Sequence, residues 1–245
     1  MNALPTRKME AYRYADVAAL ASVWSDLAHP ERVTVAAHAK LQQIWVPVAD
    51  PVQVRRAEIV LEAGATANIF ALNTAATYGR IEIDVTLADG AHFGLDAANI
   101  GSGKSTLEIV TTVRHIGVAA TSRQTVRSVL GGTAVGTYMG KVAVARGAQQ
   151  TDSVQSVKAM LIDRGATANA KPELEIYADD VKCAHGATVG ELDPQQLFYA
   201  AARGLDPASA RALLLEGFVA GLWSEIEGDD HGIAELARAA LWRVA

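Results

Sequence analysis

The chain has 245 residues, half of them apolar and 20% charged, and its net charge at pH 7 is −5. This balance is typical of a globular protein and leaves no basic surface, which excludes nucleic acid and anionic membranes as favoured partners. Aromatic residues are scarce, at 6%. The abundance of alanine, valine, threonine and glycine favours small, repetitive layers over a core of large rings.

Cys183 is the single cysteine, so no internal disulfide can form, and a reducing compartment, the cytoplasm, is the expected location. The first residues lack the apolar stretch of a secretory signal. No run of about 18 apolar residues could span a bilayer. One thiol also cannot supply the ligands of a cysteine-bound cluster or a structural zinc site. Any metal would therefore need ligands from another chain.

The first region, residues 1–54, is expected to be a short mixed or helical segment. Residues 16–24 have the pattern of a short amphipathic helix, and Pro30, Pro47 and Pro51 interrupt the rest of this region.

The middle region, residues 55–190, is expected to be mainly β. Alternating, β-branched runs are separated by glycine corners and occur at 57–61, 66–72, 80–87, 107–113, 125–130, 141–145 and 174–177. No convincing helix separates the runs, which disfavours a βαβ sheet. A sandwich, a barrel and a β-helix all fit the alternation. Frequent corners favour a solenoid of stacked strands, although no repeat of fixed length is visible.

The last region, residues 191–245, is expected to be a C-terminal helical domain that could cover an open end of the solenoid. Asp193 followed by proline, and Asp206 followed by proline, are the N-cap patterns of two helices. An apolar stripe then passes through Leu215, Phe218, Leu222 and Ile226. A third helix is expected from about 232 to 242.

Residues 101–106 (GSGKST) imitate the end of a phosphate-binding P-loop, in which backbone amides surround the phosphates. The first glycine of that pattern is replaced by Ala98, and the residues after Lys104 alternate as a strand does. A P-loop lysine instead begins a helix. We expect a surface turn between strands; nucleotide binding by Gly101 to Thr106 is the alternative.

Cys183 and His185 are two residues apart, so in an extended segment their side chains project from the same face. A thiolate beside an imidazole suits a soft or borderline metal, but two ligands form only half of a site. A buried cysteine beside an ordinary surface histidine is the alternative. The remaining histidines form no metal motif, and His115 is expected to be structural.

Residues 171–190 (KPELEIYADDVKCAHGATVG) closely resemble the signature of the SufB/SufD family of iron–sulfur cluster assembly proteins, on its SufD side. Residues 4–16, 121–132, 147–152 and 192–204 also resemble that family. The resemblance therefore touches both ends of the chain and most of the middle. The chain has little room for the fuller N-terminal helical domain of longer members.

This resemblance implies a right-handed β-helix with a C-terminal helical domain that acts as a scaffold and not as an enzyme. The implied partners are SufB, through the β-helix, and the SufC ATPase, through the C-terminal helices; a homodimer is possible in isolation. Cys183 and His185 would complement ligands from SufB at a shared interface. The chain alone would bind no cofactor stably. A nascent iron–sulfur cluster or iron would be held at the interface with SufB.

Two other classes remain as alternatives. A P-loop nucleotide-binding enzyme centred on Lys104 predicts that ATP or GTP stabilises the isolated chain. A solitary β-helical enzyme acting on carbohydrate predicts acids or bases clustered along one face of the solenoid.

Overall fold

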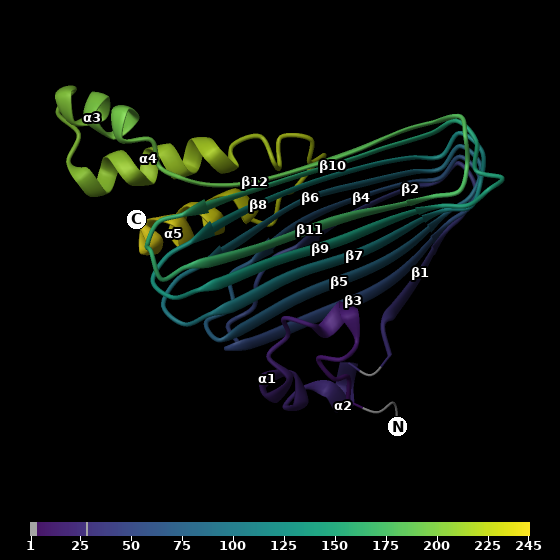
Figure 1. The fold of residues 1–245 in the computed structure, drawn as a ribbon, viewed down its shortest axis with the longest axis horizontal. Coiled ribbons are helices and arrows are strands. Elements are labelled where there is room, and N and C mark those ends of the chain that lie inside the picture. The colour runs from purple at the N-terminus through teal and green to yellow at the C-terminus, as the bar shows by residue number, and fades with distance from the viewer. Residues whose placement is uncertain (1–3, 28) are drawn as a thin grey trace.

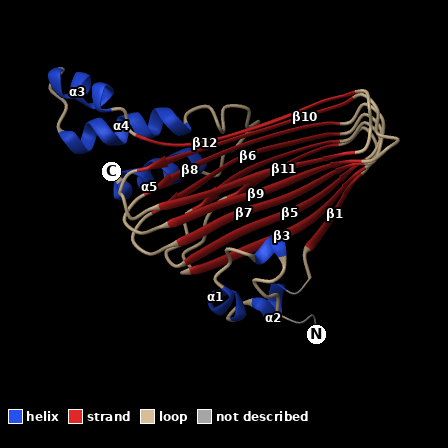
Figure 2. Cartoon of the chain, in the orientation of Figure 1, coloured by secondary structure: helices blue, strands red, loops and turns tan. Residues whose placement is uncertain are grey.

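The computed structural model describes residues 4–27 and 29–245 and shows a solenoid of parallel strands with helices near both ends of the chain (Figures 1 and 2). The strands are β1 (Glu31–Val35), β2 (Lys40–Trp45), β3 (Val52–Leu61), β4 (Thr66–Asn73), β5 (Tyr78–Leu87), β6 (His92–Gly101), β7 (Thr106–His115), β8 (Thr121–Leu130), β9 (Val135–Val144), β10 (Thr151–Leu161), β11 (Thr167–Ile176) and β12 (Val181–Glu191). The helices are η1, a 3-10 helix (Glu10–Tyr12), α1 (Val17–Ala21), α2 (Trp24–Leu27), α3 (Pro194–Ala202), α4 (Pro207–Val219) and α5 (Ile233–Val244). The prediction of a mainly β solenoid with C-terminal helices is confirmed.

Odd-numbered strands form one six-stranded sheet, in the order β1-β3-β5-β7-β9-β11, and even-numbered strands form the other. Each turn of the solenoid adds one strand to each sheet, and all neighbouring strands are parallel. The last turn supplies the end strands β11 and β12, which each pair on one side only. Residues 171–190, the segment that resembles the family signature, lie entirely on this last turn.

The turns differ in length, which explains why the sequence shows no fixed repeat. Glu31 pairs with Ala57, a step of 26 residues from 31 to 57. Val135 pairs with Thr167, a step of 32 residues from 135 to 167. Because the strands stay in register, the added residues are absorbed at the corners, where sequence spacing is free to vary.

The core between the two sheets consists of stacked inward columns. Ile59, Val85, Val113 and Val142 occupy equivalent positions on four successive turns, and all are buried. Side chains along each strand alternate between the inside and the outside of the solenoid, and the inward ones stack on the inward ones of the next turn. β-branched side chains fill it because they pack well on a pleated surface.

The stacked strands begin before residue 55. Strands β1 and β2 lie within the segment that the sequence predicts to be mixed or helical, upstream of the expected boundary at residue 54. They are short, and Pro47 and Pro51 separate them from β3, which hides their alternation. The helix expected over 16–24 is split into α1, capped by the Asp16 side chain, and α2.

The C-terminal helices begin where the sequence predicts. The Asp193 side chain accepts a hydrogen bond from the Gln195 amide at 2.8 Å, and Asp206 accepts from the amides of Ala208 and Ser209. These contacts satisfy amides that have no partner inside the helix. Helix α4 ends at Val219, so Leu222 and Ile226 of the expected stripe lie beyond it.

Helices α4 and α5 lie against the outer face of the even-numbered sheet and leave β12, its end strand on the last turn, exposed. Leu215 of α4 and Leu241 of α5 pack in one buried cluster with Phe70, Ile100 and Val129 from the sheet. Helix α3 lies beyond α4, away from the strands (Figure 1). The expectation that this region could close an end of the solenoid is therefore wrong, because its apolar residues are buried against the flank.

Candidate functional site

Cys183 and His185 both lie on β12, the end strand of the even-numbered sheet. Their Cα atoms pair with those of Ser153 and Gln155 on β10. The side chains of Ser153 and Gln155 are buried inside the solenoid, so those of Cys183 and His185 face the same interior from the last turn. Cys183 is half-buried against the core, whereas His185 is exposed.

The interior face of the last turn is open. On β10 the inward residues are buried, yet the residues above them on β12 become exposed from His185 onward, and Val189 is 50% exposed. No further turn covers them within the described residues. An end strand with unpaired backbone groups and an exposed inward row is suited to docking another chain.

The Cys183 thiol has a raised pKa. Burial contributes most, the nearby Asp152 carboxylate adds to it, and the backbone of Ser153 acts in the opposite direction. The free thiol is therefore protonated near neutral pH and would lose its proton on binding a metal.

The described residues contain no group of three or more histidine, cysteine, aspartate or glutamate side chains placed to hold a metal ion. Cys183 and His185 thus offer two potential ligands on one face. Their donor types suit a soft or borderline metal, and the prediction that a second chain supplies the remaining ligands stays a prediction.

Sequence reasoning missed the polar interior beneath these two residues. Ser153 and Gln155 are buried on β10, where a solenoid core would ordinarily hold apolar side chains. The available signal was the segment from Thr151 to Gln155, whose inward positions are all polar. His115 is buried and its Nε2 lies 2.9 Å from Ser122 Oγ, in agreement with the expected structural role.

The GSGKST segment forms a corner between strands. β6 ends at Gly101 and β7 begins at Thr106, so no helix comes after Lys104. Gly103 has φ +64°, and its carbonyl accepts a hydrogen bond from the Thr133 amide of the next corner at 2.7 Å. A phosphate would therefore meet no helix N-terminus here. The prediction of a surface turn is confirmed, and the P-loop alternative lacks its defining geometry.

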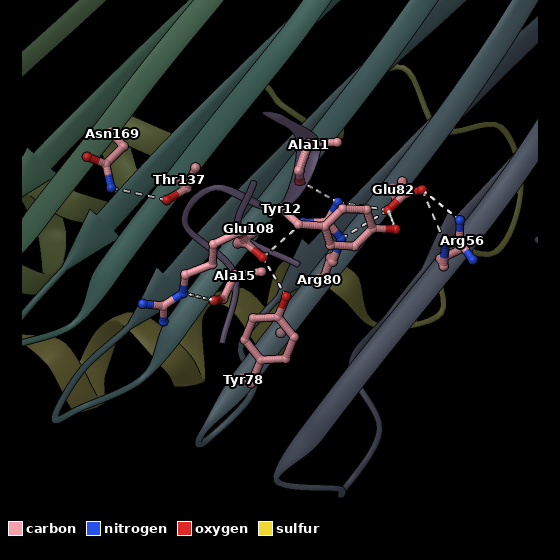
Figure 3. A network of polar contacts seen from close by, with 12 residues as sticks. Ala11, Tyr12, Ala15, Arg56, Tyr78, Arg80, Glu82, Glu108, Thr137 and Asn169 are labelled. Atoms are coloured by element: carbon pink, nitrogen blue, oxygen red, sulfur yellow. Dashed lines mark hydrogen bonds and ion pairs between the residues drawn. The ribbon is translucent and has the colours of Figure 1, made fainter. Parts of the chain in front are cut away.

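A second polar cluster attaches the N-terminal segment to the odd-numbered sheet (Figure 3). Arg80 on β5 is fully buried, and its guanidinium lies 4.2 Å from the centre of the Tyr12 ring and donates to the Ala11 carbonyl. It also pairs with Glu82 and Glu108 at 2.8 and 3.0 Å. The cluster is covered by the N-terminal segment, which indicates an anchor for that segment.

The helical segment displays exposed aromatic residues. Phe198 and Tyr199 on α3 are 77% and 62% exposed, and Tyr199, Leu205 and Leu213 line a groove between α3 and α4. Large apolar side chains grouped on a projecting helix mark a surface for protein contact. Among the described residues, none of the helices is both long enough and apolar enough for a membrane span.

The sequence matches the profile of the SUF system FeS cluster assembly, SufBD core domain, over residues 30–218. The chain therefore belongs to the SufB/SufD family of iron–sulfur cluster assembly proteins, and it is SufD-like. It is 28% identical over 213 residues to the iron–sulfur cluster assembly protein SufD of Escherichia coli, covering 85% of this chain and 50% of that protein. It is 29% identical over 138 residues to SufD of Bacillus subtilis, covering 56% of this chain and 32% of that protein.

The chain thus spans half or less of the length of these relatives. Their names describe assembly proteins, and the matched region includes every strand of the solenoid together with α3 and most of α4. The prediction of membership in this family is confirmed.

Proposed function

We propose that this chain is a non-catalytic scaffold of iron–sulfur cluster assembly that pairs with SufB through the open end of its solenoid. The observation that carries the proposal is the exposed inward row of β12, where Cys183 and His185 lie side by side. A partner solenoid docked on this end would cover the row and bring its own ligands to the same place.

In this arrangement the nascent cluster, or iron, is cargo held between two chains. Cys183 would supply a thiolate and His185 an imidazole nitrogen, and SufB would supply the remaining ligands. Thiolate and imidazole together suit iron and its clusters. No resident cofactor is required of this chain alone.

SufC is the proposed second partner, and the C-terminal helices are its proposed contact. Phe198 and Tyr199 offer exposed aromatic surface of the kind that anchors protein interfaces. Because α4 packs on the even-numbered sheet, a force applied at α3 and α4 would reach the solenoid. In this proposal SufC hydrolyses ATP. This chain lacks P-loop geometry, because a strand and not a helix comes after Lys104.

The experiment is co-expression of this chain with SufB and SufC from one genome, followed by measurement of the mass of the purified assembly. A stable assembly containing all three chains is expected. Recovery of this chain as a monomer, or as a homodimer that SufB does not displace, would contradict the proposal.

The role of the site is tested inside that assembly. His185→Ala is expected to lower cluster transfer to an apo acceptor protein while leaving the mass of the assembly unchanged. Lys182→Ala is the matched control, because Lys182 lies on the same strand, is exposed, and faces the opposite side. Equal transfer by both variants would count against the assigned role of His185.

A further inference from the structure

Two inward columns of the even-numbered sheet change from apolar to polar as they approach the last turn. They occupy equivalent positions on β6, β8, β10 and β12 and consist of Phe93, Ser122, Ser153 and Cys183 in one column and Leu95, Gln124, Gln155 and His185 in the other. The polar residues on β8 and β10 are each less than 5% exposed. Packing alone does not require them, since apolar residues fill the same positions on β6.

The glutamine column is held by a defined set of hydrogen bonds. Gln155 Nε2 donates to Tyr138 Oη at 3.1 Å, and Tyr138 Oη donates to Gln124 Oε1 at 3.2 Å. Thr111 Oγ1 donates to the same Gln124 oxygen at 2.7 Å. Because Nε2 of Gln155 is directed to Tyr138, the opposite atom of its amide, Oε1, has a fixed direction.

That oxygen has no partner. Gln155 is 1% exposed, yet its Oε1 makes no hydrogen bond to any described residue. Buried polar atoms without a partner are rare. Gln124 Nε2, the donor on the preceding turn, does not bond to this oxygen and is itself without a hydrogen bond in the described residues. The next inward position in the column, one strand spacing of about 4.8 Å away, is His185. A neutral imidazole carries one N–H donor.

We propose that Gln155 is a positioning residue for His185: its Oε1 accepts the imidazole N–H and leaves the other ring nitrogen free to bind a metal. This inference rests on the proposed metal role of His185 and adds the residue that orients the ring. A ligating histidine usually donates its second nitrogen to such an acceptor, which fixes both tautomer and ring direction. Because the Tyr138 hydroxyl gives its proton to Gln124 Oε1, it can only accept from Gln155, which keeps the Gln155 amide from turning over.

The cysteine column has a parallel arrangement. His115 Nε2 lies 2.9 Å from Ser122 Oγ, and Ser122 Oγ lies 2.9 Å from Ser153 Oγ. Ser153 is the buried neighbour of Cys183 on the preceding turn. Each proposed ligand therefore lies next to a buried polar side chain on the preceding turn. Hydrogen bonds to residues of earlier strands hold each of these polar side chains in place.

The test is a Zn²⁺ titration of the full chain labelled with ¹⁵N in its histidine rings, followed by NMR. Zn²⁺ serves as a probe of the free ring nitrogen, and the ring ¹⁵N shifts report the tautomer of each histidine separately. The variants are Gln155→Met, which removes the acceptor at similar size, and Gln155→Glu, which keeps a side-chain oxygen. Val157→Ala is the matched control, because Val157 is buried two residues further along β10, faces the same interior and has no part in these hydrogen bonds.

In the wild-type chain, Zn²⁺ is expected to convert His185 to a single tautomer with one metal-bound nitrogen. Gln155→Met is expected to weaken this binding about 10-fold, the lower end of the range for loss of a partner behind a ligand. Gln155→Glu is expected to restore most of the affinity, and Val157→Ala is expected to bind Zn²⁺ as tightly as the wild type.

Zn²⁺ binding at His185 of equal strength in the wild type and Gln155→Met would overturn the role of Gln155 and leave the metal role of His185 intact. Equal weakening by Gln155→Met and Val157→Ala would also overturn it, because a general loss of packing would then explain both. A titration in which the His185 ring of the wild type never responds would overturn the inference together with the metal role. Assembly with SufB is measured separately by mass.

Discussion

Arg80 and Glu108 form an ion pair in which neither side chain reaches solvent, with Arg80 Nη1 3.0 Å from Glu108 Oε2. The two residues are paired across neighbouring turns, on β5 and β7. Tyr78 Oη donates to the same carboxylate oxygen at 2.5 Å, and the guanidinium also contacts the N-terminal segment. A single buried contact therefore joins two turns of the solenoid to the chain that precedes it.

Replacing Arg80 with methionine is expected to destabilise the protein by about 3–5 kcal/mol, because the Glu108 carboxylate would stay buried without its cation. Arg114→Met is the control, since Arg114 pairs with Asp84 where both are exposed. Such a surface pair contributes about 0–1 kcal/mol. Urea unfolding followed by circular dichroism measures both. Similar losses of unfolding free energy in the two variants would show that the buried pair stabilises the protein no more than the exposed pair does.

A pH dependence is expected from His115. Burial, opposed in part by a hydrogen bond with the Ala120 backbone, lowers its pKa from 6.5 to about 4. The folded chain therefore keeps the ring neutral while the unfolded chain binds a proton below pH 6.5. The stability that His115 contributes is present above that pH and falls as the pH drops toward 4, by about 2 kcal/mol between pH 7 and pH 5.

Urea midpoints of the wild type and His115→Gln at these two pH values test this expectation. The amide of the variant can still bond to Ser122 but does not titrate in this range, so its midpoint should fall less on acidification. A fall as steep as that of the wild type would assign the acid sensitivity to other groups.

How far the sequence predicts this structure depends on whether a signal is local. The strands β3, β5 and β7 alternate clearly, and Asp193 and Asp206 mark helix starts through local capping chemistry. β6 has weak alternation because it is buried on both faces, between the interior of the solenoid and α5. Only the neighbouring strands and the helix reveal it as a strand.

The same distinction applies to the candidate site. Spacing alone placed Cys183 and His185 on one face, since residues two apart in a strand share a direction. Their polar neighbours Ser153 and Gln155 lie 30 residues earlier, at 153 against 183 and 155 against 185. That step differs from the 26-residue step of the first turns, so no fixed repeat could align them in the sequence.

The attachment of the helical segment to the solenoid is expected to depend on Leu215. This side chain is fully buried between α4 and the sheet, whereas Leu213 on the same helix is 56% exposed. Leu215→Ala should cost about 2–5 kcal/mol through lost burial and a residual cavity, and Leu213→Ala should cost far less. Limited proteolysis within 191–245 and thermal unfolding measure the effect. Equal protease resistance in both variants would indicate that α4 is held by other contacts.

Helix α3 supplies the last prediction, which concerns the proposed SufC contact. Phe198 is 77% exposed and makes little contact with its own chain, so Phe198→Ala should leave thermal unfolding unchanged. If its ring anchors SufC, the variant should bind SufC at least tenfold more weakly, since an anchoring aromatic contributes about 2 kcal/mol or more to an interface. Binding is measured by titration calorimetry with purified SufC.

Trp242→Ala on α5 is the control for that measurement. Trp242 is 50% exposed and also aromatic, but it lies on the helix that packs against the flank of the solenoid. Weakening by Phe198→Ala alone would assign the SufC contact to α3. Weakening by Trp242→Ala alone would move the contact to α5, and unchanged affinity in both would remove the helical segment from the proposed interface.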